Sequence, residues 1–225
     1  LQPLDEGRDG FPQRLGDGFR YPGDVLVRLL GREAAQAGRK GQGAGVEGRR
    51  AAILDGFTVT GASNDFQFDD SWAHALAGES VIASRCRVIA NRSFGDGAAV
   101  LCQGCRLTDC EFQSNFSATA TGAVSVGFQL MGGSGNPALK TDVSGCVFRS
   151  NDGRVSAIKC EGNFGTLRPI LRNCLVIGNT GERAVQFGGN TSGVVSNCRV
   201  LGNSGLFAIE CQVVSNSLIA GNDCQ

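Results

Sequence analysis

A six-residue segment that begins with Cys and ends with Asn constrains the fold most, because it recurs at intervals along the chain. Five ungapped copies lie at 86–91, 110–115, 146–151, 174–179 and 198–203. A sixth copy at 217–222 has Ser in place of Cys, and a relative at 56–61 has Gly at both marked positions. Successive cysteines are 24 to 36 residues apart, so a core of constant length alternates with insertions. This pattern predicts a solenoid, in which each repeat packs only against its neighbours.

A second set of short hydrophobic segments follows the Asn positions. These segments begin at Ala99, Ala123, Ala157, Ala184 and Ala208. Alternation of apolar and polar residues, as in Ala184-Val-Gln-Phe187, is typical of a strand with one buried face. A third strand is expected just before each Cys, as in Val194-Val-Ser-Asn197. Three strands per repeat predict an all-β parallel β-helix of about seven coils.

The repeated cysteines and asparagines are predicted to have structural roles. Cysteine behaves as a small apolar residue when buried, and thiols stacked in a line do not converge on a metal ion. We therefore expect a packing column, with no metal and no cofactor, formed by Cys86, Cys110, Cys146, Cys174 and Cys198. Asparagine tolerates left-handed backbone angles and can form ladders of amide hydrogen bonds. We expect Asn to turn the corner and to form such a ladder at Asn91, Asn115, Asn151, Asn179, Asn203 and Asn222.

Two of the repeats resemble a motif of a known family. Phe112-Gln-Ser-Asn115 and Phe148-Arg-Ser-Asn151 resemble the Phe-x-x-Asn motif of the chlamydial polymorphic membrane proteins, which are surface adhesins. The segment Asp55–Gly61 is similar to the opening coil of bacterial secreted proteins with a right-handed parallel β-helix. The resemblance covers residues 53–222. It implies the right-handed form of the fold and a secreted or cell-surface location.

The ends of the chain are expected to differ from the repeat. Residues 1–50 are predicted to form an N-terminal cap and a Gly/Arg-rich loop, with a short helix from Val25 to Ala37 that Asp24 caps and Gly38 ends. Residues 51–225 are predicted to form the β-helix domain. Because no polar cap is evident before Gln225, we expect the domain to be truncated there or to meet a partner.

Composition excludes several kinds of partner. Twenty-one basic residues balance 21 acidic residues, so no overall field attracts nucleic acid. No apolar run approaches the ~20 residues that span a bilayer. We expect the partner to be a polysaccharide, or another copy of the chain at the uncapped end.

One insertion stands outside the repeat and contains the only Trp and the only His of the chain. Its candidate binding residues are Asp69, Asp70, Trp72 and His74. An aromatic ring beside carboxylates can stack on a sugar and hydrogen-bond its hydroxyl groups. The alternative is that Trp72 packs the insertion against the stack together with Phe66 and Phe68.

The sequence leaves two classes of function open. The first is a non-catalytic secreted or cell-surface module for adhesion, carbohydrate binding or assembly. The alternative is a polysaccharide lyase or glycoside hydrolase of the pectate-lyase-like architecture, since one fold hosts several functions. Such enzymes need carboxylates on neighbouring coils with a basic residue nearby. The column of Lys159, Gln186 and Glu210 lacks adjacent carboxylates, so the sequence favours the non-catalytic class.

Overall fold

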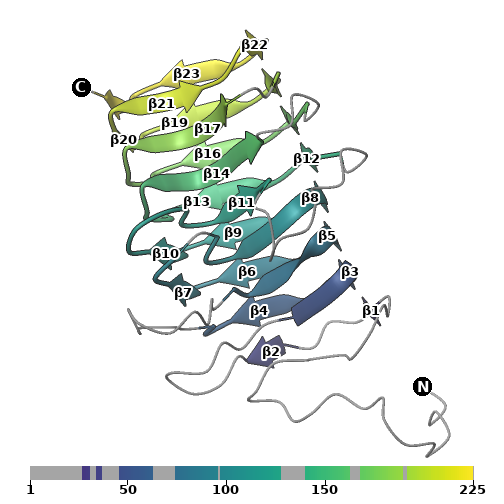
Figure 1. Cartoon of the computed structure of the whole chain (residues 1–225). Coiled ribbons are helices and arrows are strands. Elements are labelled where there is room, and N and C mark those ends of the chain that lie inside the picture. The colour runs from purple at the N-terminus through teal and green to yellow at the C-terminus, as the bar shows by residue number, and fades with distance from the viewer. Residues whose placement is uncertain are drawn as a thin grey trace, which may run out of the picture.

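The fold consists of parallel β-strands stacked in layers along one axis (Figure 1). A computed structural model describes residues 27–30, 34–36, 46–62, 74–95, 97–127, 140–162, 168–189 and 192–224. Every regular element in these ranges is a strand, and all strands of the sheets pair in parallel. The expected all-β, parallel arrangement is confirmed, and it is compatible with a parallel β-solenoid.

The largest sheet has twelve strands and two arms. Its first arm stacks β11 (Val124–Val126), β14 (Val155–Gly162), β17 (Arg183–Gly189) and β21 (Phe207–Glu210). Its second arm stacks β12 (Asp142–Ser144), β15 (Ile170–Arg172), β18 (Val194–Ser196) and β22 (Val213–Ser215). The long strand β8 (Val100–Thr108) joins the arms, because it pairs with both β11 and β12. Below β8 the sheet continues through β5 (Leu76–Ser84) and β3 (Val46–Asp55) to β1 (Val27–Leu30).

The second sheet has eight strands and contains the middle residues of each Cys-to-Asn repeat. In stacking order it comprises β2 (Ala34–Gln36), β4 (Thr58–Thr60), β6 (Arg87–Ile89), β9 (Glu111–Gln113), β13 (Val147–Arg149), β16 (Leu175–Ile177), β19 (Arg199–Leu201) and β23 (Leu218–Ala220). Two small sheets pair β7 (Arg92–Ser93) with β10 (Phe116–Ser117), and β20 (Ser204–Gly205) with β24 (Asp223–Cys224). The eight strands give one layer more than the seven that the sequence predicts.

The additional layer replaces the helix predicted from Val25 to Ala37, and that prediction is wrong for the residues described there. Strand β1 pairs with β3, and β2 pairs with β4. The apolar residues of this segment fit a helical period as well as an alternating one, and pairing with the edges of two sheets decides between them. The stack therefore includes residues as early as Val27.

The core consists of columns in which like residues lie above one another. The inner column of the eight-stranded sheet is almost fully buried and contains Val59, Val88, Phe112, Phe148, Val176 and Val200. The rings of Phe112 and Phe148 stack with centroids 5.0 Å apart and an interplanar angle of 14°. Burial of these side chains, one per layer, is the main stabilising contribution to a stack of short strands.

Two corners of each repeat have left-handed backbone conformation. One precedes the Cys position and includes Asn173 (φ 54°) and Asn197 (φ 52°). The other precedes the ladder asparagine and includes Ala90 (φ 55°), Ser150 (φ 52°) and Gly178 (φ 61°). The expectation that the ladder asparagine itself takes the left-handed angle is therefore wrong. The preceding residue turns the chain, which leaves the asparagine side chain pointing into the stack.

Candidate functional site

The insertion with the predicted binding residues is described only at its end. Asp69, Asp70 and Trp72 lie outside the described residues. His74 is placed just before β5 and is 7% exposed, with Nδ1 2.9 Å from the carbonyl oxygen of Gly97. This hydrogen bond ties the start of β5 to the corner before β8. His74 is thus a buried residue that joins two layers.

The five repeated cysteines lie in one buried column. Each thiol donates to a main-chain oxygen two residues earlier, at 3.1 to 3.4 Å. Hydrogen bonding to the neighbouring thiol and burial together raise the pKa of Cys86, Cys146 and Cys198, whereas hydrogen bonds with neighbouring thiols lower the pKa of Cys110 and Cys174. All five thiols are buried and hydrogen-bonded within the stack, so they pack and are not accessible to a substrate. Among the described residues, no group of three or more His, Cys, Asp or Glu side chains could hold a metal ion.

The six repeated asparagines are joined by side-chain amides from Asn91 to Asn222. Each Nδ2 donates to Oδ1 of the next asparagine at 2.9 to 3.0 Å. The same Oδ1 accepts the main-chain N–H of the asparagine below at 2.9 to 3.1 Å. Nδ2 also donates to a strand carbonyl in the layer below, as in Asn151 to Phe112 at 3.0 Å. Because these amides are engaged in hydrogen bonds within the stack, the column offers no binding group to solvent.

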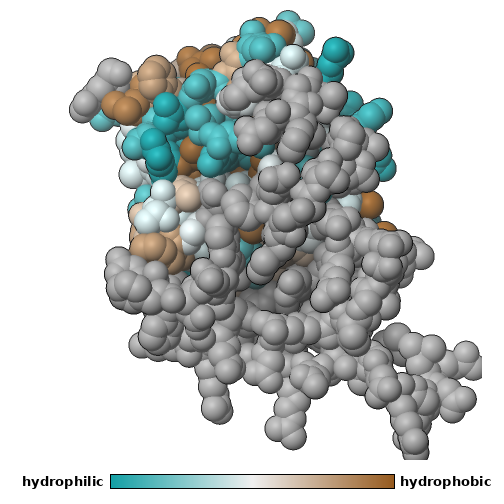
Figure 2. Space-filling view, viewed as in Figure 1, coloured by the Kyte–Doolittle hydropathy of each residue, from teal (hydrophilic) through white to brown (hydrophobic). Residues whose placement is uncertain are grey.

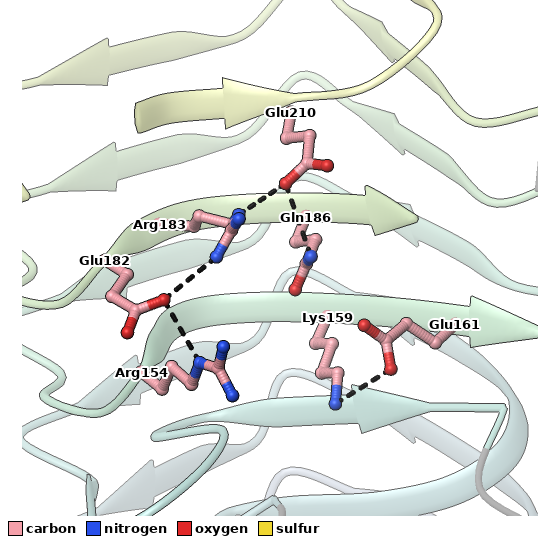
Figure 3. A network of polar contacts seen from close by, with 7 residues as sticks. All are labelled: Arg154, Lys159, Glu161, Glu182, Arg183, Gln186 and Glu210. Carbon is pink, nitrogen blue, oxygen red and sulfur yellow. Dashed lines mark hydrogen bonds and ion pairs between the residues drawn. The ribbon is translucent and has the colours of Figure 1, made fainter. Parts of the chain in front are cut away.

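The outer face of the first arm carries a group of polar side chains, which we call the polar cluster (Figure 3). Its members are Arg154, Lys159, Glu161, Glu182, Arg183, Gln186 and Glu210. Three neighbouring strands position them, because Lys159, Gln186 and Glu210 occupy one register column across β14, β17 and β21. Arg154 and Glu182 directly precede the arm's strands, at the corner where the chain enters β14 and β17.

The polar cluster is held together by ion pairs that cross from strand to strand (Figure 3). Glu182 Oε2 lies 3.1 Å from Arg154 Nε and 3.0 Å from Arg183 Nη1. The Arg183 guanidinium also pairs with Glu210, to which Gln186 Nε2 donates at 3.3 Å. Because hydrogen bonding to Arg154 stabilises its ionised form, Glu182 has a lowered pKa. The three basic and three acidic members of the cluster balance each other.

An ion pair between Lys159 and Glu161 forms the other edge of the polar cluster, and the ring of Phe207 lies beside Arg183. Lys159 Nζ lies 3.0 Å from Glu161 Oε2 on the same strand. Phe207 is 50% exposed, and the Arg183 guanidinium lies 5.5 Å from its ring centroid. Further down the same outer column, Ser125 is 3% exposed and Leu101 1%. The outer face is therefore open to solvent at the polar cluster and closed over β8 and β11.

The sequence pattern did not reveal the polar cluster. Lys159, Gln186 and Glu210 lie further along their strands, whereas Arg154, Glu182 and Arg183 lie where the strands begin. The register that pairs Val155 with Arg183 brings Arg154 beside Glu182, and the register of β17 with β21 brings Glu210 to Arg183. When Arg154-Val155 is aligned with Glu182-Arg183, charged residues recur at the start of successive strands. That recurrence is the signal in the sequence that could have revealed the cluster.

Comparison of the chain with protein-family models, curated proteins and solved structures finds no match. No helix that could cross a membrane occurs in the part of the chain that the structure describes. Function is therefore inferred from the geometry of the molecule itself.

Proposed function

We propose that the chain is a right-handed parallel β-helix that serves as a non-catalytic binding module, secreted or at the cell surface, with a neutral carbohydrate as its ligand. The fold is supported by eight layers of parallel strands, by two left-handed corners per repeat and by the resemblance to secreted β-helix proteins. The ligand class is supported by one observation. Planar polar side chains, held by one another, lie next to an exposed phenylalanine on the outer face of three adjacent strands.

This combination of groups suits a sugar. A sugar ring has an apolar face that stacks on an aromatic ring and a rim of hydroxyl groups that both donate and accept. Phe207 supplies the ring, Arg183 donates, Glu210 accepts and Gln186 does both. Neighbouring strands lie ~4.8 Å apart, close to the length of one sugar residue in an extended chain. A glycan that crosses β14, β17 and β21 would then contact successive strands with successive sugars.

The charges of the polar cluster favour a neutral ligand. Each carboxylate of the cluster is paired with an arginine or a lysine, so the surface presents no net field to attract a polyanion. A polyanion would have to displace Glu182 or Glu210 from Arg183. Hydroxyl groups can instead bind around the existing ion pairs.

The same ion pairs argue against general acid catalysis. Glycoside hydrolysis requires a carboxyl group whose pKa is raised, so that it carries a proton near neutral pH. Arg154 has the opposite effect on Glu182, whose pKa is lowered. Glu182 is therefore ionised under those conditions, and we propose that it positions Arg154 and Arg183.

A panel of neutral and acidic polysaccharides tests this function, with binding measured by calorimetry and turnover by product formation. We expect a neutral glycan to bind without turnover. The Phe207→Ala variant should bind it roughly fivefold more weakly, because stacking on an aromatic ring contributes ~1 kcal/mol. Arg172→Ala serves as the matched control, since Arg172 forms an ion pair with Asp142 on the other arm. This control should bind as the unmodified chain does.

Three outcomes would contradict the proposal. One is the absence of binding to every neutral glycan. Another is turnover that Glu182→Gln or Glu210→Gln abolishes, which would assign the chain to the enzymes. The third is binding that Trp72→Ala abolishes and Phe207→Ala leaves unchanged, which would move the site to the insertion.

A further inference from the structure

A column of solvent-facing side chains runs along the corner between the eight-stranded sheet and the first arm. Each member directly follows a ladder asparagine, and parallel pairing places each one next to its counterpart in the neighbouring layer. We call this set the corner column, and its members in stacking order are Arg92, Phe116, Asp152, Thr180 and Ser204. Phe116 is partly exposed and the other four are exposed. Figure 1 shows β7, β10 and β20, which contain Arg92, Phe116 and Ser204, along one edge of the stack.

The corner column is adjacent to the polar cluster. Glu182 of the cluster lies two residues after Thr180, and only Gly181 separates them. A Cβ added at Gly181 would lie 1.8 Å from the carbonyl oxygen of Gly153, which occupies the equivalent place one layer below. No side chain fits between the two sets of polar groups, so a ligand can contact both at once. Figure 2 shows hydrophilic residues gathered at this edge of the stack, next to hydrophobic ones.

The lower end of the corner column holds an arginine against an aromatic ring. The Arg92 guanidinium lies over the Phe116 ring, 4.5 Å from its centroid. A guanidinium that rests on a ring loses little freedom on binding, and its N–H groups can donate to the hydroxyl oxygens of a ligand. The same combination of groups occurs beside the polar cluster, where Arg183 lies over Phe207. The two stacks are at different heights along the same edge.

The upper members of the corner column supply the complementary groups. The Asp152 carboxylate can accept hydrogen bonds from sugar hydroxyls. The hydroxyl oxygens of Thr180 and Ser204 lie 3.4 Å apart, and each hydroxyl can both donate and accept. One basic and one acidic member leave the corner column without net charge. It therefore suits a neutral ligand, as the polar cluster does.

The other path for a long ligand is closed. Below Lys159, the outer column of the first arm continues through Ser125 and Leu101, which are 3% and 1% exposed. The corner column instead stays open to solvent over its five layers. Its length is roughly 19 Å at ~4.8 Å per layer, which corresponds to about five sugars of an extended chain.

We propose that the glycan-binding surface extends along the corner column, so that it takes an extended neutral glycan of about five sugars lying parallel to the stack axis. The upper sugars contact Phe207 and the polar cluster, and the lower sugars contact Asp152 and Arg92. This inference rests on the proposed function and adds the length and the direction of the ligand. A glycan that coils would leave the line of the corner column and contact its upper part only.

Calorimetry with a length series of the neutral oligosaccharide that binds in the polysaccharide panel tests this extension. Affinity should rise from a short ligand of two sugars to a long ligand of about five, and then level off. Arg92→Gln should weaken binding of the long ligand roughly fivefold, because a hydrogen bond to a lower sugar is lost, and should leave the short ligand unaffected. Arg106→Gln is the matched control, since Arg106 is exposed in the same repeat but lies where β8 pairs with the second arm. This control should bind both ligands as the unmodified chain does.

The length series separates failure of this extension from failure of the proposed function. Unchanged binding of the short ligand shows that Arg92→Gln is folded. If Phe207→Ala weakens the short ligand, but affinity does not rise with length or Arg92→Gln leaves the long ligand unaffected, the extension is wrong and the proposed function stands. If no neutral oligosaccharide of any length binds, both are wrong. Equal weakening of the short and long ligands by Arg92→Gln and by Asp152→Asn would also overturn the extension, since neither residue would then act on the lower sugars.

Discussion

At the scale of the residue, position in the layer decides what each repeated side chain does. Asparagine occurs both in the buried ladder and at the exposed corner before the Cys position, with opposite environments. Asn151 is fully buried, and its side-chain amide forms hydrogen bonds with the ladder asparagines of the layers on either side. Asn197 is exposed and is left-handed, with φ 52°. The first role requires the amide, and the second requires only a residue that tolerates a positive φ.

This difference predicts opposite results for two asparagine substitutions. Asn151→Leu removes the amide and leaves buried main-chain and side-chain groups of two neighbouring layers without partners, so the free energy of unfolding should fall by about 2–4 kcal/mol. Asn197→Gly keeps an allowed left-handed corner and should change the free energy of unfolding by less than about 0.5 kcal/mol. Urea denaturation measures both values. Equal effects of the two substitutions would contradict the role assigned to the ladder.

The exposed ion pairs predict that stability decreases in acid. Hydrogen bonds to Arg154 and to Arg85 lower the pKa of Glu182 and Asp55 from ordinary values of 4.5 and 3.8. A lowered folded-state pKa means that each pair stabilises the fold above the unfolded-state pKa, and that this stabilisation is lost as the pH falls through the folded-state pKa. The urea midpoint should therefore be lower at about pH 3 than at about pH 7, with the decrease beginning below about pH 5.

The variant Arg154→Gln should show a smaller decrease of the midpoint over this pH range, because Glu182 loses the partner that lowers its pKa. Arg199→Gln provides the control, since Arg199 forms no ion pair within the described ranges. A pH dependence that is the same in Arg154→Gln, in Arg199→Gln and in the unmodified chain would contradict the assigned cause.

At the scale of the element, the short strands of the eight-stranded sheet depend on the corners that set their register. The corner before the ladder asparagine is Gly in three layers, at Gly178, Gly202 and Gly221, and a residue with a side chain in three others. A side chain at positive φ costs about 1 kcal/mol, which glycine avoids. Glycine also raises the entropy of the unfolded chain, which offsets part of this gain.

Ala90→Gly should therefore stabilise the protein by about 0.5 kcal/mol, because Ala90 has φ 55°. Ala157→Gly is the matched control in a buried strand, where glycine should destabilise the protein by about 1 kcal/mol or more. Thermal unfolding gives the sign of each change. Destabilisation by both substitutions would show that the corner is not strained.

The strands and corners also differ in how far the sequence predicts them. Two columns with fixed spacing identify the strands of the repeat, because a side chain stacked on its counterpart recurs at the same place in each layer. The segment at Val27–Leu30 lacks both marker residues, so its apolar residues fit a helix as well as a strand, and only pairing with β3 decides the outcome. The left-handed angle before each ladder asparagine is equally hidden, because Ala90, Ser150 and Gly178 share no side-chain property.

At the scale of the whole molecule, structure and proposed binding use different surfaces. The amides and thiols of the repeat are directed inward, where they join the layers. The polar cluster occupies the outer face of the first arm. The candidate site was harder to predict than the fold, because Arg154, Glu182 and Arg183 come together through the register of separate layers.

NMR mapping of a neutral glycan on the isotope-labelled chain shows whether the polar cluster is the binding surface. The glycan to use is the one that calorimetry selects from the polysaccharide panel. We expect amide shift changes confined to β14, β17, β21, the corners that enter them and the corner column, with unchanged signals from the ladder asparagines. Shift changes centred on Asp69, Asp70 and Trp72, or an absence of changes at saturating glycan, would contradict the proposed site.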